Sequence, residues 1–397
     1  MKKKLSLLIA LAITISVSTT SLAAGATTSD TSTTTNVTNT ATTVAASTLT
    51  LDEVLNNVES SSVDLQSIDK KLEALNAQYD SDKRQVAAID ASGKSESQYS
   101  NGQYAQIMIQ KEVTPLQDEQ SINDEKIARD EKLNTIKFDL EKQYMNAITA
   151  KNQIDNINKN ITDLDEQIAQ IQAKIDLGQE TKDAVNSLFV QKSKLLSQLA
   201  SPNTQLQQSL LNIKKYLNMS LTSDLKLVDA KKDYVKFDDT DIESKINSAL
   251  LLDNSLSSLN KSIELQQKQV DIQTKYAYNS LTEPANSQLT LEDLQNNLSN
   301  TTTSLSVSLW SAYYALKNKE DTVQAQLVSQ ESAQMTYDKQ KQSYDNGMID
   351  KVTLDSAELA LNTQKVSTQQ AINDYMITQE KFNYVINGHA SLASSIQ

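Results

Sequence analysis

The sequence contains few residues that turn or break a chain. Among 397 residues there are 6 glycines and 3 prolines, against usual frequencies of about 7% and 5%. Sandwiches and propellers need a turn signal every ~8–12 residues, so this scarcity argues against turn-rich β architectures. Long helices, which need few such residues, are the predicted structure.

The side chains on which most enzyme active sites depend are also scarce. Cysteine is absent and His389 is the only histidine, so disulfides, thiol catalysis, zinc clusters and histidine-based proton transfer have almost no raw material. The 37 basic side chains face 50 acidic ones, which leaves no positive excess to neutralise nucleic-acid phosphates. We therefore predict neither an enzyme nor a nucleic-acid-binding protein, and no cofactor or metal site.

The N-terminus has the pattern of a targeting segment. Three lysines at positions 2–4 precede the apolar run 5–13, and small residues follow around Ala23 and Ala26. This pattern predicts a secretory signal peptide over residues 1–26. The alternative is a retained anchor helix, for which the apolar run is short against ~30 Å of hydrocarbon. Cleavage would change the formal net charge from −13 to −16, because three lysines and no acids are removed.

A threonine-rich segment follows the signal. Residues 27–49 contain 11 Thr and 3 Ser in 23 positions and little that could be buried, which predicts a disordered tether. No later apolar stretch reaches the length that a membrane-spanning helix needs. The mature chain is therefore predicted to have no transmembrane helix.

The body of the chain carries a heptad pattern. Apolar residues recur at alternating steps of three and four, with one interruption at Gln143, which predicts a coiled-coil seam. They are Leu133, Ile136, Leu140, Ala147, Ala150, Ile154, Ile157, Ile161, Leu164, Ile168, Ile171 and Ile175. A helix over residues 133–177 would be about 68 Å long.

A second apolar stripe follows Gly178 and runs from Val185 to Leu217. A glycine between two helical patterns predicts a tight antiparallel hairpin. Pro202 should break or kink the returning helix, because proline lacks the backbone N–H of a helix interior.

The hairpin occurs twice. One constant shift in residue number pairs Leu140 with Leu309, Tyr144 with Tyr313, Asp176 with Asp345, Gly178 with Gly347, Ser187 with Ser356, and Asn218 with Asn387. Upstream a larger constant shift pairs Asn56 with Asn247 and Leu65 with Leu256. The first copy therefore carries a longer insert than the second between these two regions. The chain is predicted to be a tandem duplication.

These observations predict an all-α fold of long antiparallel coiled-coil hairpins with little or no β-structure. The first repeat covers residues 50–220, a connector 221–240, the second repeat 241–388 and a tail 389–397. Asn218 and Asn387 are expected to close the returning helices in left-handed conformations. His389 is expected to be exposed in the tail.

Several segments resemble one known family. The opening helices at residues 51–58 and 242–250, the second tip at 344–349 and the acidic helix that follows it from Asp355 are similar to those of the outer-membrane efflux protein (TolC) family. Asp374-Tyr375, Phe382 and Gly388 also fit the way the family's last helix closes. The resemblance covers residues 50–390 and both copies.

The resemblance implies a homotrimer, in which each chain contributes four helical strands to a twelve-stranded α-barrel. Such a duct is passive, lies in the outer membrane of cells that have one, and works with a periplasmic adaptor (membrane fusion) protein and an inner-membrane transporter. The rival hypothesis is a structural coiled-coil or adhesion protein of the cell envelope, which heptads and a threonine-rich tether would suit equally.

One departure from the family concerns its membrane-spanning β-barrel. The family inserts two barrel strands per copy, at positions that correspond here to residues 80–117 and 275–303. Transmembrane strands need ~9–11 alternating residues, but the best candidate, Tyr104–Ile109, alternates only briefly, and the second insert is typical of helix. The barrel inserts are predicted to be reduced or missing, which leaves outer-membrane insertion open.

The candidate functional residues lie at the hairpin tips. Gly178, Gly347 and Tyr344 are the predicted adaptor-docking residues. In the family, acidic rings near the tips narrow the entrance and favour cations, and the candidates here are Asp355, then Asp350 and Asp183. Threefold repetition would place three carboxylates in a narrow lumen, where their repulsion favours bound cations. The alternative is that these acids are solvated residues of an acidic protein, placed favourably at helix N-termini.

Overall fold

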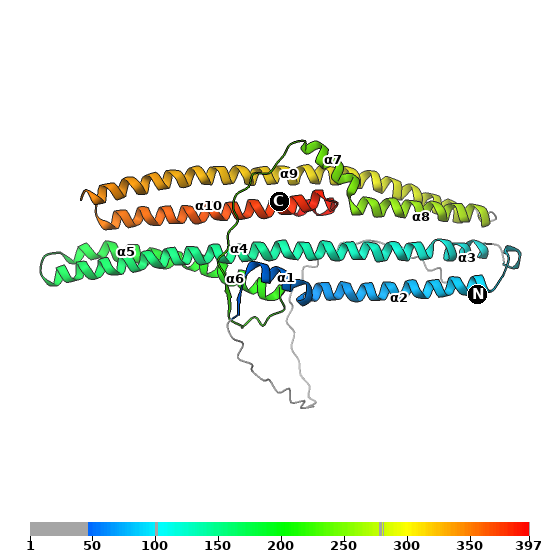
Figure 1. Ribbon diagram of the computed structural model, residues 1–397, viewed down its shortest axis with the longest axis horizontal. Coiled ribbons are helices and arrows are strands. Elements are labelled where there is room, and N and C mark those ends of the chain that lie inside the picture. Colours follow the sequence, from blue (N-terminus) through cyan, green and yellow to red (C-terminus); the bar gives the residue numbers. More distant parts are fainter. Residues whose placement is uncertain (1–46, 100–101, 278–279, 281, 397) are drawn as a thin grey trace, which may run out of the picture. The chain divides into compact units, whose positions relative to one another are not determined.

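Figure 1 shows a computed structural model of the chain, which describes residues 47–99, 102–277, 280 and 282–396. The predicted signal peptide, residues 1–26, and the tether up to residue 46 lie outside the described residues. The described residues belong to one compact unit. None of their helices combines the length and apolar character needed to cross a membrane.

The predicted all-α architecture is confirmed. The first repeat contains α1 (Leu51–Ser61), α2 (Val63–Ala91), a 3₁₀ turn (Glu96–Gln98), α3 (Gln103–Glu112), α4 (Thr114–Asp176), α5 (Lys182–Gln198) and α6 (Ala200–Tyr216). The second contains α7 (Ile242–Leu252), α8 (Asn254–Tyr276), α9 (Thr282–Asp345), α10 (Lys351–Ile386) and a C-terminal 3₁₀ turn (Ala390–Ser395). The longest, α4 and α9, have 63 and 64 residues, about 95 Å each. They pack against α5 and α6, and against α10, respectively (Figure 1).

The two repeats begin with the same break between helices. Ser62 ends α1 and caps α2 by accepting a hydrogen bond from Leu65 N, 3.4 Å away. Asp253 is its equivalent in the second repeat and caps α8 by accepting from Ser255 N and Leu256 N, both at 3.0 Å. Serine and aspartate are preferred caps because their side chains satisfy free N–H groups in the first helical turn. The duplication thus extends to the local hydrogen bonds.

Each long helix ends in a glycine of left-handed conformation. Gly178 and Gly347 have φ of +72° and +71°. Gly178 N donates to the carbonyl of Ile175 (2.9 Å), and Gly347 N donates to that of Tyr344 (2.8 Å). Glycine suits these positions because a Cβ disfavours positive φ.

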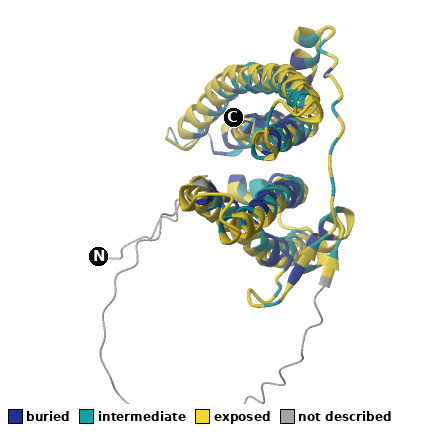
Figure 2. Ribbon diagram, turned by 90° about the vertical axis from the view of Figure 1, so that its left-hand side faces the viewer, coloured by how far each residue is buried: buried dark blue, intermediate teal, exposed yellow. Residues whose placement is uncertain are grey.

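Each repeat packs around an apolar cluster of its own. Leu140 and Leu309, equivalent in the duplication, are fully buried in the clusters of the first and second repeat. The predicted heptad seam contributes Leu133, Ile136 and Leu140 to the first cluster. Figure 2 shows exposed residues along the outer sides of the long helices and buried residues on the sides that face other helices. This is the pattern expected of narrow helical seams.

A short parallel sheet corrects the predicted extent of the tether. β1 (Ser47–Leu49) pairs with β2 (Leu225–Leu227). The Tyr144 hydroxyl donates to the carbonyl of Val228 (2.6 Å) and lies 3.1 Å from that of Leu49. Residues 47–49, assigned to the tether from their composition, are therefore ordered, because β2 supplies backbone partners that a composition argument cannot see.

The insert of the first repeat is helical. The brief alternation at Tyr104–Ile109, too short for the strand it was tested against, lies inside α3. α3 packs on α8 of the second repeat, where Ala105 shares a cluster with Leu265 and Ile272. A short alternation carries too little information to override such a helical partner. The second insert, predicted to be helical, belongs largely to the end of α8 and the beginning of α9.

The ends of the returning helices match the predictions in part. Asn218 has φ of +50°, as predicted, whereas Asn387 has φ of −97° and Gly388 takes the positive value, +104°. Glycine is available next to Asn387 and accepts this conformation at lower cost. The break expected near Pro202 falls at Leu199, so that Pro202 lies in the first turn of α6, where a missing N–H costs no helical bond.

Candidate functional site

The tips expose apolar side chains beside their glycines. Leu177, before Gly178, is 73% exposed, and Met348, after Gly347, is 68% exposed. Tyr344 is partly exposed, and its backbone carbonyl accepts the Gly347 hydrogen bond. Each tip therefore presents an exposed apolar residue next to a hydrogen-bonded glycine turn.

Two of the three candidate ring acids are exposed near the tips. Asp350 caps α10, where Oδ1 accepts from Thr353 N at 2.8 Å. Hydrogen bonds from the side chain and the backbone of Thr353 hold the pKa of Asp350 below its usual value. Asp183 lies in the first turn of α5, and its Oδ1 accepts from Asn186 Nδ2 at 3.4 Å. Both acids occupy helix N-termini, where negative charge is favourable.

The third candidate, Asp355, is buried. It is 6% exposed, accepts a hydrogen bond from Gln167 Nε2 at 2.7 Å, and forms an ion pair with Lys351. Because Gln167 belongs to α4, the contact joins the first repeat to α10. An ion pair between the repeats, Lys159 to Glu358, lies one turn further along α10. The structure therefore does not bring the three acids onto one exposed surface, and a ring of carboxylates stays a prediction.

The connector is fastened by a charged cluster. Lys232 lies 2.6 Å from a carboxylate oxygen of Glu141 on α4 and 2.7 Å from one of Glu380 on α10. Burial raises the pKa of Glu141. Buried charges of this kind are tolerated when they are paired, so Lys232 ties the connector to both repeats.

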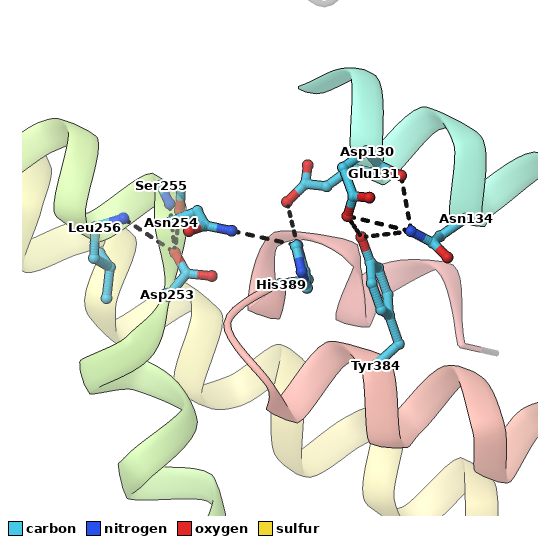
Figure 3. Close-up of polar contacts among 9 residues, drawn as sticks. All are labelled: Asp130, Glu131, Asn134, Asp253, Asn254, Ser255, Leu256, Tyr384 and His389. Carbon is cyan, nitrogen blue, oxygen red and sulfur yellow. Dashed lines mark hydrogen bonds and ion pairs between the residues drawn. The ribbon is translucent and has the colours of Figure 1, made fainter. Parts of the chain in front are cut away.

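His389 is not the exposed tail residue that the sequence suggested. Its ring stacks on Tyr384 with centroids 4.0 Å apart, and Nδ1 lies 2.9 Å from Glu131 Oε1 and 3.4 Å from Asn254 Nδ2. Tyr384 donates to Asp130 at 2.9 Å. Figure 3 shows that these groups come from α4, α8, α10 and the segment after it. The C-terminal segment thus forms a junction between the repeats, which no local pattern could reveal because Glu131 belongs to the first repeat.

Among the described residues, no group of three or more histidine, cysteine or carboxylate side chains is arranged to hold a metal ion.

The outer face of α9 carries an apolar stripe. Its members recur at multiples of seven residues and are each about 60–70% exposed: Val307, Tyr314, Val328 and Met335. Val307 and Tyr314 follow the buried positions Leu305 and Ala312 by two residues, which places these two side chains on the opposite side of the helix. Sequence reasoning missed this second heptad because the core seam of α9 is itself weakly apolar. The exposed residue Asp321 occupies the position between Tyr314 and Val328, so the stripe consists of two exposed apolar pairs, Val307 with Tyr314 and Val328 with Met335.

The fold is shared with outer-membrane channels. The CmeC outer membrane channel of Campylobacter jejuni has a TM-score of 0.63 at 12% identity, over 85% of this chain and 86% of that chain. The open state of the Neisseria gonorrhoeae MtrE outer membrane channel has 0.60 at 10%, over 86% and 89%. The Vibrio cholerae outer membrane protein VceC has 0.56 at 8%, over 85% and 96%. No protein-family model and no curated protein matches the sequence. At such low identity the likeness shows the fold, and the resemblance to the efflux family is confirmed at that level.

Proposed function

We propose that this protein, which has the fold of outer-membrane efflux channels, is one protomer of a passive trimeric exit duct of the cell envelope. The observation that carries the proposal is the likeness over more than four fifths of the chain, with both helical repeats included. The solved relatives are described as outer membrane channels. In a cell with an outer membrane the duct would lie there.

The exposed stripe of α9 supports assembly. A single chain leaves Val328 and Met335 in water, although an exposed heptad stripe is the kind of surface that another helix covers. Exposed apolar residues also occur on α5, at Phe189 and Leu196, again seven residues apart. Because the two stripes differ, contact between copies would be heterologous, and heterologous contacts that close form rings.

The tips support docking to other components. Leu177 and Met348 are exposed beside the glycine turns, which suits burial against helices of a periplasmic adaptor that links the duct to an inner-membrane transporter. No catalytic step is assigned to the duct.

The oligomeric state tests the proposal directly. The mature chain should have the mass of three copies in solution or detergent. Val328→Asp should shift it towards the monomer, because three charges would be buried at the contacts. Thr322→Asp is the matched control, since Thr322 is exposed on the same helix but about 120° around it from Val328. A monomer or dimer in the wild type would favour the rival structural coiled-coil or adhesion protein.

The acidic ring is tested separately, by reversal potentials of assembled ducts in a planar bilayer. If the ring exists, Asp350→Asn, Asp183→Asn or Asp355→Asn should reduce the preference for cations. Unchanged reversal potentials in all three variants would contradict the acidic ring and leave these acids with helix-capping and inter-helix contacts only.

A further inference from the structure

Two helical edges of the chain expose residues at the same spacing. Towards the tips α9 contacts α10, α10 contacts α4, and α4 contacts α5 and α6, which leaves α9 on one edge and α5 with α6 on the other. Exposed residues recur every seven positions on α9: Val307, Tyr314, Asp321, Val328 and Met335. On the other edge Phe189, Leu196 and Asn203 are exposed at the same spacing, and Leu211 follows.

The second series crosses from α5 to α6 without a change of direction. Leu199, between the two helices, keeps helical dihedral angles, with φ of −66° and ψ of −23°. Both edges therefore carry a straight row of exposed positions on one helical face.

Three contacts inside the chain determine which residues of the two edges are level. They join neighbouring antiparallel helices: Lys192 to Asp165 (2.5 Å), Gln167 to Asp355 (2.7 Å) and Gln364 to Gln326 (2.6 Å). Asp165 lies two residues before Gln167 and is therefore level with residue 357 of α10. Residue 357 lies seven residues before Gln364 and is therefore level with residue 333 of α9. Lys192 of α5 and residue 333 of α9 are thus at the same height, to within about one helical turn.

We propose that α9 of one copy packs antiparallel along α5 and α6 of the next copy, with level residues facing each other. Counted from the level pair 192 and 333, the facing residues are Val328 with Leu196, Met335 with Phe189, and Tyr314 with Leu211, each within one residue of level. Exposed apolar side chains of one edge are then buried against those of the other. This inference rests on the exit-duct proposal and names the surface that closes its ring.

Charge complementarity favours a second copy in this register. Glu331 on α9 and Lys194 on α5 are level, both are exposed, and neither has an ion-pair partner in the described part of the chain. Asp321 faces Asn203, whose amide N–H groups can donate to a carboxylate. Residues 195–213 contain no charged side chain, although 22% of the chain is charged. By contrast, a two-fold contact between two α9 helices would centre on the row and set Asp321 against its own copy.

Cysteine cross-linking of the mature full-length protein tests the register, because the sequence has no cysteine of its own. Val328→Cys with Leu196→Cys should form disulfides between neighbouring copies when diamide takes up the two thiol hydrogens. Each copy carries both thiols, so the ring closes covalently, and a non-reducing denaturing gel should show a band of three chains. Val328→Cys with Leu211→Cys is the matched control. Leu211 lies about 22 Å beyond Leu196, whereas a disulfide needs Cα atoms within about 7 Å, so this variant should remain a single chain.

Two further variants complete the test. Tyr314→Cys with Leu211→Cys should cross-link again, which shows that position 211 can react. Asn203→Asp should raise the concentration at which the trimer dissociates at least about tenfold, because it places like charges together, and adding Asp321→Lys should restore the trimer. Failure of this rescue would contradict the pairing of the two positions.

The outcomes separate the register from the duct. A trimeric mass with no Val328–Leu196 cross-link, or with equal cross-linking in the matched control, would overturn the register and leave the exit duct intact. Dimers from Val328→Cys alone would show a contact between two α9 helices and would also overturn it. A monomeric wild type would contradict both proposals.

Discussion

Replacing Gly388 by alanine should destabilise the chain more than the same replacement at either tip glycine. At Gly178 and Gly347, a Cβ would meet nothing within 4 Å, so the cost is confined to positive φ values of +72° and +71°. These values lie close to the left-handed well that an L-residue can occupy, at a cost of roughly 1 kcal/mol.

Gly388 adds two costs. Its φ of +104° lies outside that well, where strain is about 1–3 kcal/mol. A Cβ would also lie 3.0 Å from the carbonyl oxygen of Leu252, a backbone atom that cannot swing aside. If the backbone at residue 388 moves to relieve this clash, it weakens the hydrogen bond from Asn254 N to the Gly388 carbonyl, which is 3.0 Å long. Such a hydrogen bond contributes about 1 kcal/mol. Together these effects give an expected cost for Gly388→Ala of about 2–4 kcal/mol.

Urea unfolding followed by circular dichroism measures the difference. The midpoint should fall more for Gly388→Ala than for Gly347→Ala, with the slope unchanged. Hydrogen exchange should quicken first where α7 meets α8, since the substitution strains the contact with Leu252. Equal midpoints for the two variants would contradict this expectation, because both would then bear only the cost of a positive φ.

Asp118, His389 and the two tip glycines each give a further prediction. Burial and a hydrogen bond with Asp82 raise the pKa of Asp118 to about 6. Between the unfolded pKa and pH 6 the folded chain therefore keeps a proton that the unfolded chain has released, and stability falls as the pH rises towards 6. Asp118→Asn should stabilise the chain above pH 6 but not near pH 4, by less than about 1 kcal/mol because solvent screens the pair, and thermal melts at several pH values would show this. His389→Ala should lower the free energy of unfolding by about 1–2 kcal/mol, because the stack and the hydrogen bond are lost, and should speed hydrogen exchange in the turn of α4 that faces His389. Exchange as slow as in the wild type would contradict a stabilising contact between His389 and α4. Gly178→Val with Gly347→Val should leave helix content largely intact and abolish adaptor-dependent export, and normal export would show that the tips are not the docking site.

Sequence reasoning succeeded where the decisive information is local. The heptads from Leu133 onward require only that one helical face be apolar, and Gly178 ends them because glycine tolerates positive φ. The duplication could be detected because its copies still share landmarks at a constant spacing. These features predict long helices, two tips and the fold class before any partner helix is placed.

Contacts between distant parts of the chain were out of reach. The candidate strand at Tyr104–Ile109 is helical because α8 of the other repeat packs against it. Asp355 has the sequence context of an exposed ring acid, but it is buried against Gln167, which belongs to the other repeat. No residue within a few turns of these positions carries the information.

The helices, their reversal points and their repetition could be derived without any tertiary contact, since helical periodicity and the tolerance of glycine for positive φ are properties of neighbouring residues. The packing of the helices, by contrast, decides two contacts: His389 lies against Glu131, and Asp355 lies against Gln167. Both pairings depend on how α10 and the segment after it lie along α4, a helix of about 95 Å, and a small change in their register would exchange one set of partners for another.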